Sequence, residues 1–232
     1  TALTFKKPII VSLMGSDTFA TGLWRFAIAI FNLVFWKAII VKSNGMKEKL
    51  KLKNVHILPN GIDFDKFSLI PKQEAIKKTG FDKNKKHIIF VANPERPEKN
   101  YNLAKEAFHL ANLKNTELHT VYNLPHDEIV KYFFAADTLI LTSKYEGSPN
   151  VIKEAMACNL PIVSTNVGDV EQIIGNTEGC FICEPKADQI AKSIVKAISF
   201  NGRTEGRAKI SWLSEEKTAN NLIEIYKEIL AK

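Results

Sequence analysis

The sequence is poor in the residues that build small disulfide-stapled or glycine-rich proteins. Its 232 residues include only three cysteines, Cys158, Cys180 and Cys183, which are too few for a disulfide framework and indicate a reducing compartment. Glycine and proline number only 11 and 9, which excludes collagen-like and low-complexity classes. Glycine-rich phosphate motifs with dinucleotide or P-loop spacing are also lacking. What remains is an ordinary globular composition of one or two domains.

A long apolar run that could cross a membrane is lacking too. The most apolar stretch, residues 22–40, is interrupted by Arg25, Asn32 and Lys37. Arg25 and Lys37 are only twelve residues apart, whereas a membrane span needs about 20 apolar residues. We therefore expect residues 23–40 to form a helix that another surface covers. The chain begins at Thr1, and no signal peptide is readable.

The charge balance points to an anionic partner. The formal net charge is +7 at pH 7, which suits a nucleotide, an acidic glycan or an anionic membrane face. The basic residues alternate with acidic ones and form no stripe with interleaved aromatics, so nucleic acid is not expected as a partner.

Short β-branched runs alternate with helical patterns along most of the chain. This alternation predicts βαβ units and an α/β fold, a Rossmann-like parallel sheet with helices on both faces. Strands are expected at residues 8–13, 38–42, 55–58, 87–91, 117–122, 138–142, 161–165 and 179–183. Helices are expected at residues 99–113, 126–136, 149–158, 170–175, 187–200 and 214–230. The best domain boundary is the turn at residues 58–61, Leu-Pro-Asn-Gly.

The most informative segment is residues 146–157, where Glu146 and Glu154 lie on either side of a predicted helix start. Ser148 is a suitable N-cap and Pro149 a suitable first-turn residue. The amino end of this helix would offer backbone N–H groups and a positive dipole to a phosphate. The two carboxylates would be about 12 Å apart, too far for a glycosidase pair. They could flank a diphosphate, although a charged loop and a solvated helix face would give the same pattern.

Two loops that follow predicted strands hold further candidates. Arg96 and Lys99 could grip a diphosphate, arginine by its fork and lysine as a point charge. Gly15 would let backbone approach a ligand at the carboxyl end of a parallel strand, where α/β proteins bind ligands. Taken alone, these residues are explained more simply by a solvated basic loop and by a plain turn with a helix N-cap.

No metal site is predicted. Asp63 and Asp65 follow a turn without further ligands nearby. Cys180 and Cys183 lack a second ligand pair and are expected to be core thiols. The histidines are scattered and belong to no recognisable triad: His56, His87, His109, His119 and His126.

In this order and spacing, the motifs resemble the retaining nucleotide-sugar glycosyltransferases of family 4, which have the GT-B fold. The family pattern of two glutamates separated by seven residues matches Glu146 and Glu154. Residues 55–67 are similar to the stretch that opens the donor domain, and Lys99 matches the basic residue after that domain's first strand. Residues 124–137 resemble the segment near the nucleotide base.

The chain also departs from the family. Ala92 and Asn93 stand where the family usually has Gly-Arg, and Arg96 is the candidate replacement. Met14 stands before Gly15 where the family often has histidine.

The resemblance implies the role of each site residue. Glu146 would bind hydroxyls of the donor sugar, Glu154 the ribose, and Lys99 would neutralise the leaving phosphate. Catalysis would thus involve Glu146 and Lys99, and nucleotide-sugar binding Gly15, Asn93, Arg96, Ser148, Pro149, Asn150, Val151 and Glu154. Transfer of a hexose would retain the anomeric configuration and need no metal or cofactor.

The resemblance also implies a division of the chain. Residues 1–52 would be a remnant of the amino-terminal acceptor domain, residues 53–210 the donor domain, and residues 211–232 a helix that crosses back. With the acceptor half incomplete, this chain alone is expected to show little or no transfer.

The implied donor is a UDP-, GDP- or ADP-sugar, and the implied acceptor a glycan or lipid-linked molecule. The base, the sugar and the acceptor stay open. The location would be cytoplasmic, with the positive charge favouring an anionic membrane surface. Two alternatives remain: a non-catalytic module that binds nucleotide-sugars or docks on membranes, and a nucleotide-sugar epimerase on the same fold.

Overall fold

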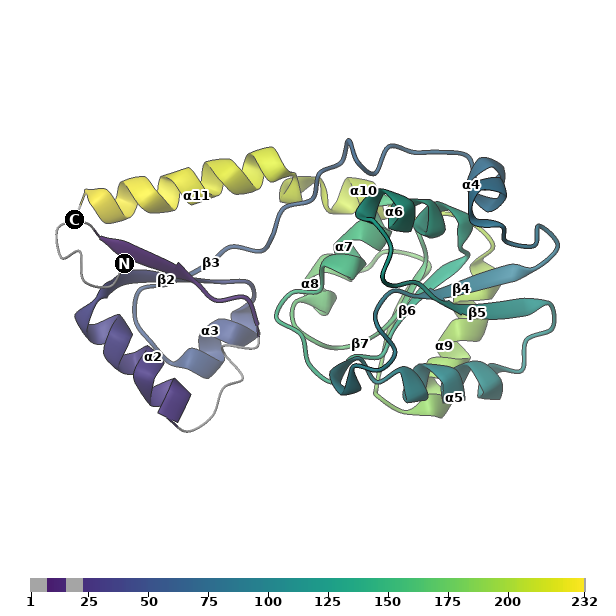
Figure 1. The fold of residues 1–232 in the computed structure, drawn as a ribbon, viewed down its shortest axis with the longest axis horizontal. Coiled ribbons are helices and arrows are strands. Elements are labelled where there is room, and N and C mark those ends of the chain that lie inside the picture. Colours follow the sequence, from purple (N-terminus) through teal and green to yellow (C-terminus); the bar gives the residue numbers. More distant parts are fainter. Residues whose placement is uncertain (1–7, 16–22, 232) are drawn as a thin grey trace. The chain divides into compact units, whose positions relative to one another are not determined.

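The computed structural model describes residues 8–15 and 23–231 (Figure 1). The chain divides into two compact units. The first comprises the chain up to Gly61, Glu146–Ser148 and the chain from Leu213 onward, and the second comprises Ile62–Tyr145 and Pro149–Trp212. Each unit is built around its own sheet of parallel strands.

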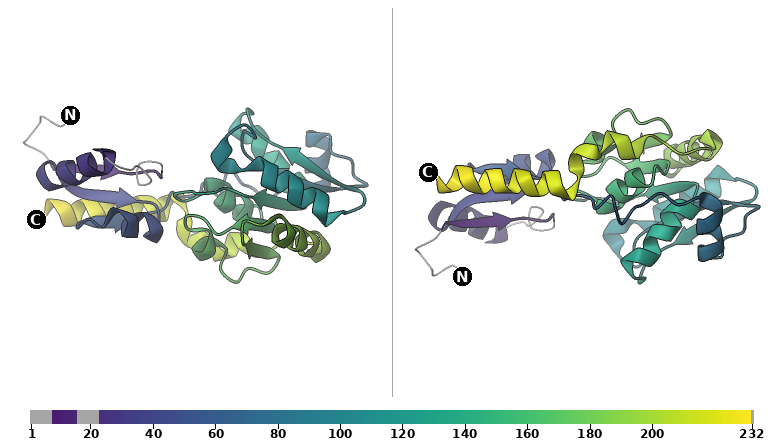
Figure 2. Two further views of the ribbon diagram at one scale, coloured as in Figure 1. Left: turned by 90° about the horizontal axis from the view of Figure 1, so that it is seen from below. Right: turned by 90° about the horizontal axis from the view of Figure 1, so that it is seen from above.

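The first unit has a three-stranded sheet in the order β1-β2-β3. Helices α2 and α3 lie on one face and α11 runs along the other (Figures 1 and 2). The core is formed by Leu13, Ile28, Ile39, Val41, Met46, Leu50 and Val55. The elements are β1 (Ile9–Ser12), α2 (Leu23–Val34), β2 (Trp36–Val41), α3 (Asn44–Leu50), β3 (Val55–Ile57) and α11 (Glu215–Leu230).

The single helix expected over residues 23–40 is wrong in its second half. Helix α2 ends at Val34, and β2 begins at Trp36. The β-branched residues of β2 favour a strand, and Ile39 and Val41 are completely buried between the covering helices. On α2, by contrast, Trp24 is 72% exposed and Leu33 85% exposed. Within the described ranges, no helix combines the length and the apolar character needed to cross a bilayer.

The second unit has a five-stranded sheet in the order β5-β4-β6-β7-β8, with β5 at one edge. Helices α5 and α9 pack together on one face, and α4 and α6 pack together on the other (Figure 1). The strands are β4 (Lys86–Phe90), β5 (Thr116–Thr120), β6 (Thr138–Leu141), β7 (Ile162–Thr165) and β8 (Cys180–Cys183). The helices are α4 (Lys72–Thr79), η1 (Pro97–Lys99), α5 (Tyr101–Ala111), α6 (His126–Ala135), α7 (Asn150–Ala157), α8 (Val170–Ile174), α9 (Ala187–Phe200), α10 (Gly206–Lys209) and η2 (Ser211–Leu213).

The predicted α/β architecture is confirmed. All eight predicted strands and all six predicted helices from residue 99 onward are present, each within two residues of its expected ends. Helices α3, α4 and α10 were not predicted. In α4 only Ala75 is buried, so it has no apolar stripe, and α3 is a short helix that Ser43 begins by accepting a hydrogen bond from the Met46 N–H.

Several turns use asparagine where a glycine would be usual. Among the described residues, eight that are not glycine have a positive φ, and seven of them are asparagine. Asn112 ends α5 and Asn201 ends α9, both in the left-handed conformation. Asparagine tolerates this conformation better than other residues with a side chain.

Asp137, at the junction of α6 and β6, ties three segments of the second unit together. Its Oδ1 accepts hydrogen bonds from Lys72 Nζ at 2.6 Å and Lys86 Nζ at 3.1 Å, and its Oδ2 accepts one from the His87 N–H at 2.9 Å. Burial alone would raise the pKa of Asp137, but these donors outweigh it and hold the pKa below its ordinary value.

This lowered pKa predicts an acid-sensitive contribution to stability. Because the folded pKa lies below the unfolded one, the contribution is full above the ordinary value of 3.8 and is lost as the pH falls toward the folded pKa. We expect the free energy of unfolding, measured with urea at about pH 6 and about pH 3, to fall more in the wild type than in Asp137→Asn. Equal losses in the two proteins would contradict this assignment.

Candidate functional site

The loop after β4 carries Asn93 and Arg96, both held by local contacts. Asn93 Oδ1 accepts a hydrogen bond from the Glu95 N–H at 2.9 Å, which closes a turn. Arg96 Nε donates to Glu98 Oε1 at 2.7 Å. The Glu98 backbone N–H and Arg96 lower the pKa of Glu98 and keep its carboxylate ionised. A diphosphate that binds Arg96 would therefore have to compete with this carboxylate.

Lys99 is positioned by the loop that follows the neighbouring strand β6. Thr142 Oγ1 donates to the carbonyl oxygens of Lys99 at 3.1 Å and Asn100 at 3.0 Å. The Lys144 N–H donates to the Glu98 carbonyl at 2.9 Å. These bonds clamp the loop after β4 to the loop after β6, at the carboxyl edge where α/β sheets bind ligands.

A cavity of about 550 Å³ extends along the same edge. It is lined by residues that follow or end three adjacent strands: Ser143, Lys144, Thr165, Asn166, Val167, Ile182, Cys183, Glu184 and Pro185.

Helix α7 begins one residue later than predicted. Its N-cap is Pro149, with φ −70° and ψ 112°, and its first residue is Asn150. The assignment of Ser148 as N-cap is therefore wrong, since Pro149 itself has the extended conformation of a cap. Proline has no polar side chain, so it cannot accept a hydrogen bond from the first N–H groups of α7. These groups, including those of Asn150 and Val151, therefore need other partners.

Glu154, on the second turn of α7, pairs with a histidine that sequence reasoning did not single out. Its Oε1 lies 3.3 Å from Nε2 of His126, the first residue of α6. The side chain of Glu154 is 15% exposed. Burial raises the pKa of Glu154, and the attraction of His126 offsets only part of this effect. The His126 ring also meets Phe67 edge-on, with 5.7 Å between the ring centroids.

The remaining predicted residues, Gly15, Glu146 and Ser148, belong to the first unit. Glu146 and Ser148 are half-buried. Gly15 has φ +145°, and a Cβ on Gly147 would lie 2.8 Å from the Met14 carbonyl oxygen and 2.9 Å from Gly15 Cα. No side chain fits at position 147, so these two segments touch backbone to backbone.

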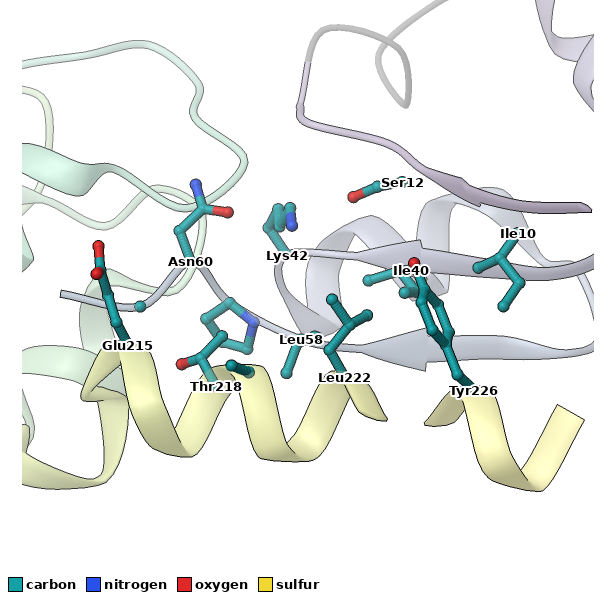
Figure 3. A pocket seen from close by; sticks show the side chains of 13 residues that line it. Ile10, Ser12, Ile40, Lys42, Leu58, Asn60, Glu215, Thr218, Leu222 and Tyr226 are labelled. Atoms are coloured by element: carbon teal, nitrogen blue, oxygen red, sulfur yellow. The ribbon is translucent and has the colours of Figure 1, made fainter. Parts of the chain in front are cut away.

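A separate pocket of about 430 Å³ lies inside the first unit, between its sheet and α11 (Figure 3). Ser12, Lys42 and Asn60 face it from the sheet side, and Glu215 and Tyr226 face it from α11. Burial lowers the pKa of Lys42. None of the predicted site residues lines this pocket, and sequence reasoning missed it because its walls come from four separate segments.

The cysteines are not reactive groups. All three are free, and burial raises the pKa of each thiol, for Cys180 to about 12. Cys183 Sγ donates to Ser193 Oγ at 3.0 Å. At neutral pH these thiols stay protonated.

Comparison with known proteins shows which family the chain belongs to. The model of the protein family described as "Glycosyl transferases group 1" matches residues 111–228, just over half of the chain. TuaC of Bacillus subtilis (strain 168), named as a glycosyltransferase of teichuronic acid biosynthesis, is 25% identical over 212 residues, which cover 82% of this chain and 54% of TuaC. The O-antigen chain mannosyltransferase B of Escherichia coli is 27% identical over 110 residues, 45% of this chain and 28% of that protein. The chain thus spans about half the length of TuaC.

Solved structures share the fold. Sucrose-phosphate synthase from Thermosynechococcus elongatus superimposes with a TM-score of 0.81 at 17% identity, over 98% of this chain and 69% of that one. HepE from Anabaena, in complex with UDP, gives a TM-score of 0.81 at 15% identity, over 96% of this chain and 73% of that one. Both the family match over residues 111–228 and the shared GT-B-like fold lead to one conclusion: the chain belongs to the group 1 glycosyl transferases, family 4.

Proposed function

We propose that this chain supplies the donor site of a retaining hexosyltransferase and binds a nucleoside-diphosphate sugar. The observation that carries the proposal is the junction after β6. There the chain clamps the Lys99 loop through Thr142 and Lys144 and, a few residues later, enters α7 with Glu154 on its second turn. The segment after β6 thus contacts the loop that carries Lys99 and leads into the helix that carries Glu154. A cation, a helix amino end and a carboxylate are the groups that can bind the diphosphate and ribose of a nucleotide.

Each group has a role in this proposal. The Lys99 ammonium, with the N–H groups and dipole of α7, stabilises the negative charge that builds on the leaving diphosphate. Glu154 accepts hydrogen bonds from the ribose hydroxyls, and Glu146 accepts them from the donor sugar. Because cationic and N–H groups carry the leaving-group charge, the proposed transfer needs no metal ion.

The domain roles are part of the same proposal. The proposed donor domain, residues 53–210, corresponds to the second unit except for residues 53–61 and Glu146–Ser148, which belong to the first. The proposed acceptor part, residues 1–52, and the helix of residues 211–232 that would cross back to it correspond to the rest of the first unit, apart from Ser211 and Trp212. A glycan or lipid-linked acceptor is supported by relatives named for teichuronic acid biosynthesis and for the O-antigen chain. The net charge of +7 favours binding of the protein to an anionic membrane surface.

Calorimetric titration with UDP, GDP and ADP tests the donor site. We expect one of the three to bind, with UDP the first choice because HepE was solved with UDP and UDP-glucose. Uridine, which lacks the diphosphate, is the control and should bind at least about tenfold more weakly, a loss of about 1.4 kcal/mol. No heat with any of the three diphosphates, up to about millimolar concentration, would refute the proposal.

A further inference from the structure

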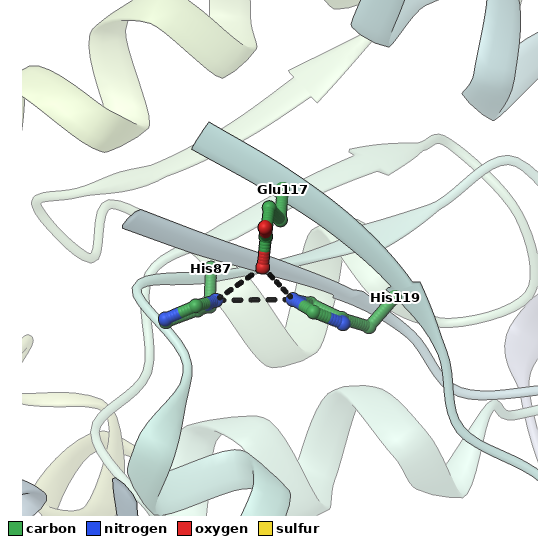
Figure 4. A group of neighbouring side chains, drawn as sticks. All are labelled: His87, Glu117 and His119. Atoms are coloured by element: carbon green, nitrogen blue, oxygen red, sulfur yellow. Dashed lines mark hydrogen bonds and ion pairs between the residues drawn. The ribbon is translucent and has the colours of Figure 1, made fainter. Parts of the chain in front are cut away.

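Two histidines that lie far apart in the sequence converge with a glutamate on the sheet of the second unit (Figure 4). His87 is on β4, and Glu117 and His119 are two residues apart on β5, so they share one face. Nδ1 of His87 lies 3.0 Å from Nε2 of His119. Oε2 of Glu117 lies 3.8 Å from the former atom and 3.5 Å from the latter.

The surroundings fix how these side chains face one another. Nε2 of the completely buried His87 lies 2.8 Å from the Asp82 carbonyl oxygen. Only an N–H can make that contact, so the proton of neutral His87 is on Nε2, and Nδ1 turns a lone pair toward His119. Phe81 stacks on both imidazoles, with 4.2 Å between ring centroids in each case. The other oxygen of Glu117 accepts a hydrogen bond from Lys85.

We propose that His87 Nδ1, Glu117 Oε2 and His119 Nε2 bind a divalent transition-metal ion of the zinc type, with water as the fourth ligand. Tetrahedral bonds of about 2.0–2.1 Å put ligand atoms about 3.3 Å apart, and the three separations of 3.0, 3.5 and 3.8 Å bracket that value. A donor set of two imidazoles and one carboxylate suits Zn²⁺, Co²⁺ or Ni²⁺ rather than Mg²⁺ or Ca²⁺. The ring N–H of His87 bonded to a carbonyl is the outer contact that metal-bound histidines usually make.

The protonation states agree with this site. Burial, reinforced by the neighbouring His87, lowers the pKa of His119, which keeps the ring neutral. The Lys85 ammonium lowers the pKa of Glu117 and keeps it anionic. A simple hydrogen bond from His119 Nε2–H to His87 Nδ1 is the competing arrangement, and it excludes the metal because it occupies both nitrogens.

The place of the site suggests a structural role. His87 lies at the amino end of β4, whereas Asn93 and Lys99 follow its carboxyl end. The metal would join β4 to β5, the edge strand of the sheet. The ion is therefore proposed to hold this edge strand, independently of the proposed donor site.

Titration of the tag-free, chelator-treated chain with Zn²⁺ and with Co²⁺ tests the proposal. We expect one Zn²⁺ per chain, a rise in Tm on binding, and the intense visible bands of tetrahedral Co²⁺. His119→Gln and Glu117→Gln should each weaken Zn²⁺ binding at least about tenfold. His109→Gln is the matched control, because this histidine lies exposed on α5, and it should bind Zn²⁺ as the wild type does.

Three outcomes would overturn the site. They are no stoichiometric uptake of Zn²⁺ at about 10 µM, His119→Gln binding Zn²⁺ as tightly as the wild type, or His109→Gln losing as much affinity as His119→Gln. Titration of UDP, GDP and ADP in the same chelator-treated samples keeps this result separate from the donor-site proposal.

Discussion

Glu154→Ala is expected to weaken binding of the preferred nucleoside diphosphate roughly 10- to 100-fold. The proposed pair of hydrogen bonds to the ribose is made to a charged acceptor, and such a bond contributes about 1.5–3 kcal/mol. The fold should not suffer, because burial raises the pKa of Glu154 and so works against its charged form in the folded protein. Calorimetry should thus show lost affinity while the Tm stays unchanged or rises slightly.

Glu146→Ala is the matched control for this result. Because Glu146 is assigned to the sugar, its loss should leave affinity for the free diphosphate unchanged and weaken binding of the intact nucleotide-sugar. Equal losses of diphosphate affinity in the two variants would contradict the roles given to both carboxylates. A His126→Ala variant, titrated with the same diphosphate, would show whether the imidazole helps to position the Glu154 carboxylate.

Arg203→Ala is expected to lower the free energy of unfolding by about 3 kcal/mol or more. The guanidinium donates to the carbonyl oxygens of Phe133 at 3.0 Å and Ala136 at 3.1 Å, and also to that of Phe134. Carbonyls at the end of a helix such as α6 have no partner within the helix. Burial lowers the pKa of Arg203, but an arginine side chain stays protonated in proteins because its ordinary pKa is so high. Its removal leaves three carbonyls to find water in a partly buried site.

Urea denaturation of Arg203→Ala beside Arg96→Ala measures this effect. Arg96 is exposed and pairs with Glu98 at the surface, so its loss should change the free energy of unfolding by no more than about 1 kcal/mol. Arg203→Lys should fall between the wild type and Arg203→Ala, because one ammonium does not reach three carbonyls as the planar fork does. A cost for Arg203→Ala no larger than that for Arg96→Ala would show that solvent satisfies the end of α6.

The strands were predictable because most of them are covered on both faces. Every residue of β6 and β7 is buried, and such strands read as continuous apolar runs. Residues 23–40 are also a nearly continuous apolar run, and here the prediction of a single helix was wrong. The run contains a helix and a buried strand with only Phe35 between them. A run of apolar residues does not by itself tell helix from strand.

The candidate site was predictable only where it is local in sequence. Glu146, Glu154 and Lys99 were identified from short motifs, and the motif around Glu154 predicted the start of α7 to within one residue. The contact of His126 with Glu154, and the reach of Arg203 to α6, depend on how separate elements pack. His87 and His119 are 32 residues apart, and only the pairing of β4 with β5 joins them. The one available signal was Glu117 and His119 at alternate positions of a predicted strand.

The left-handed asparagines have a consequence for the denatured chain. Glycine loses more conformational freedom on folding than any other residue, and the turns at Asn100, Asn112 and Asn201 avoid that loss. Each asparagine instead carries a local strain of about 1 kcal/mol. Asparagine in place of glycine therefore narrows the range of conformations open to the unfolded chain at these positions, so that less conformational entropy is lost when the turns form.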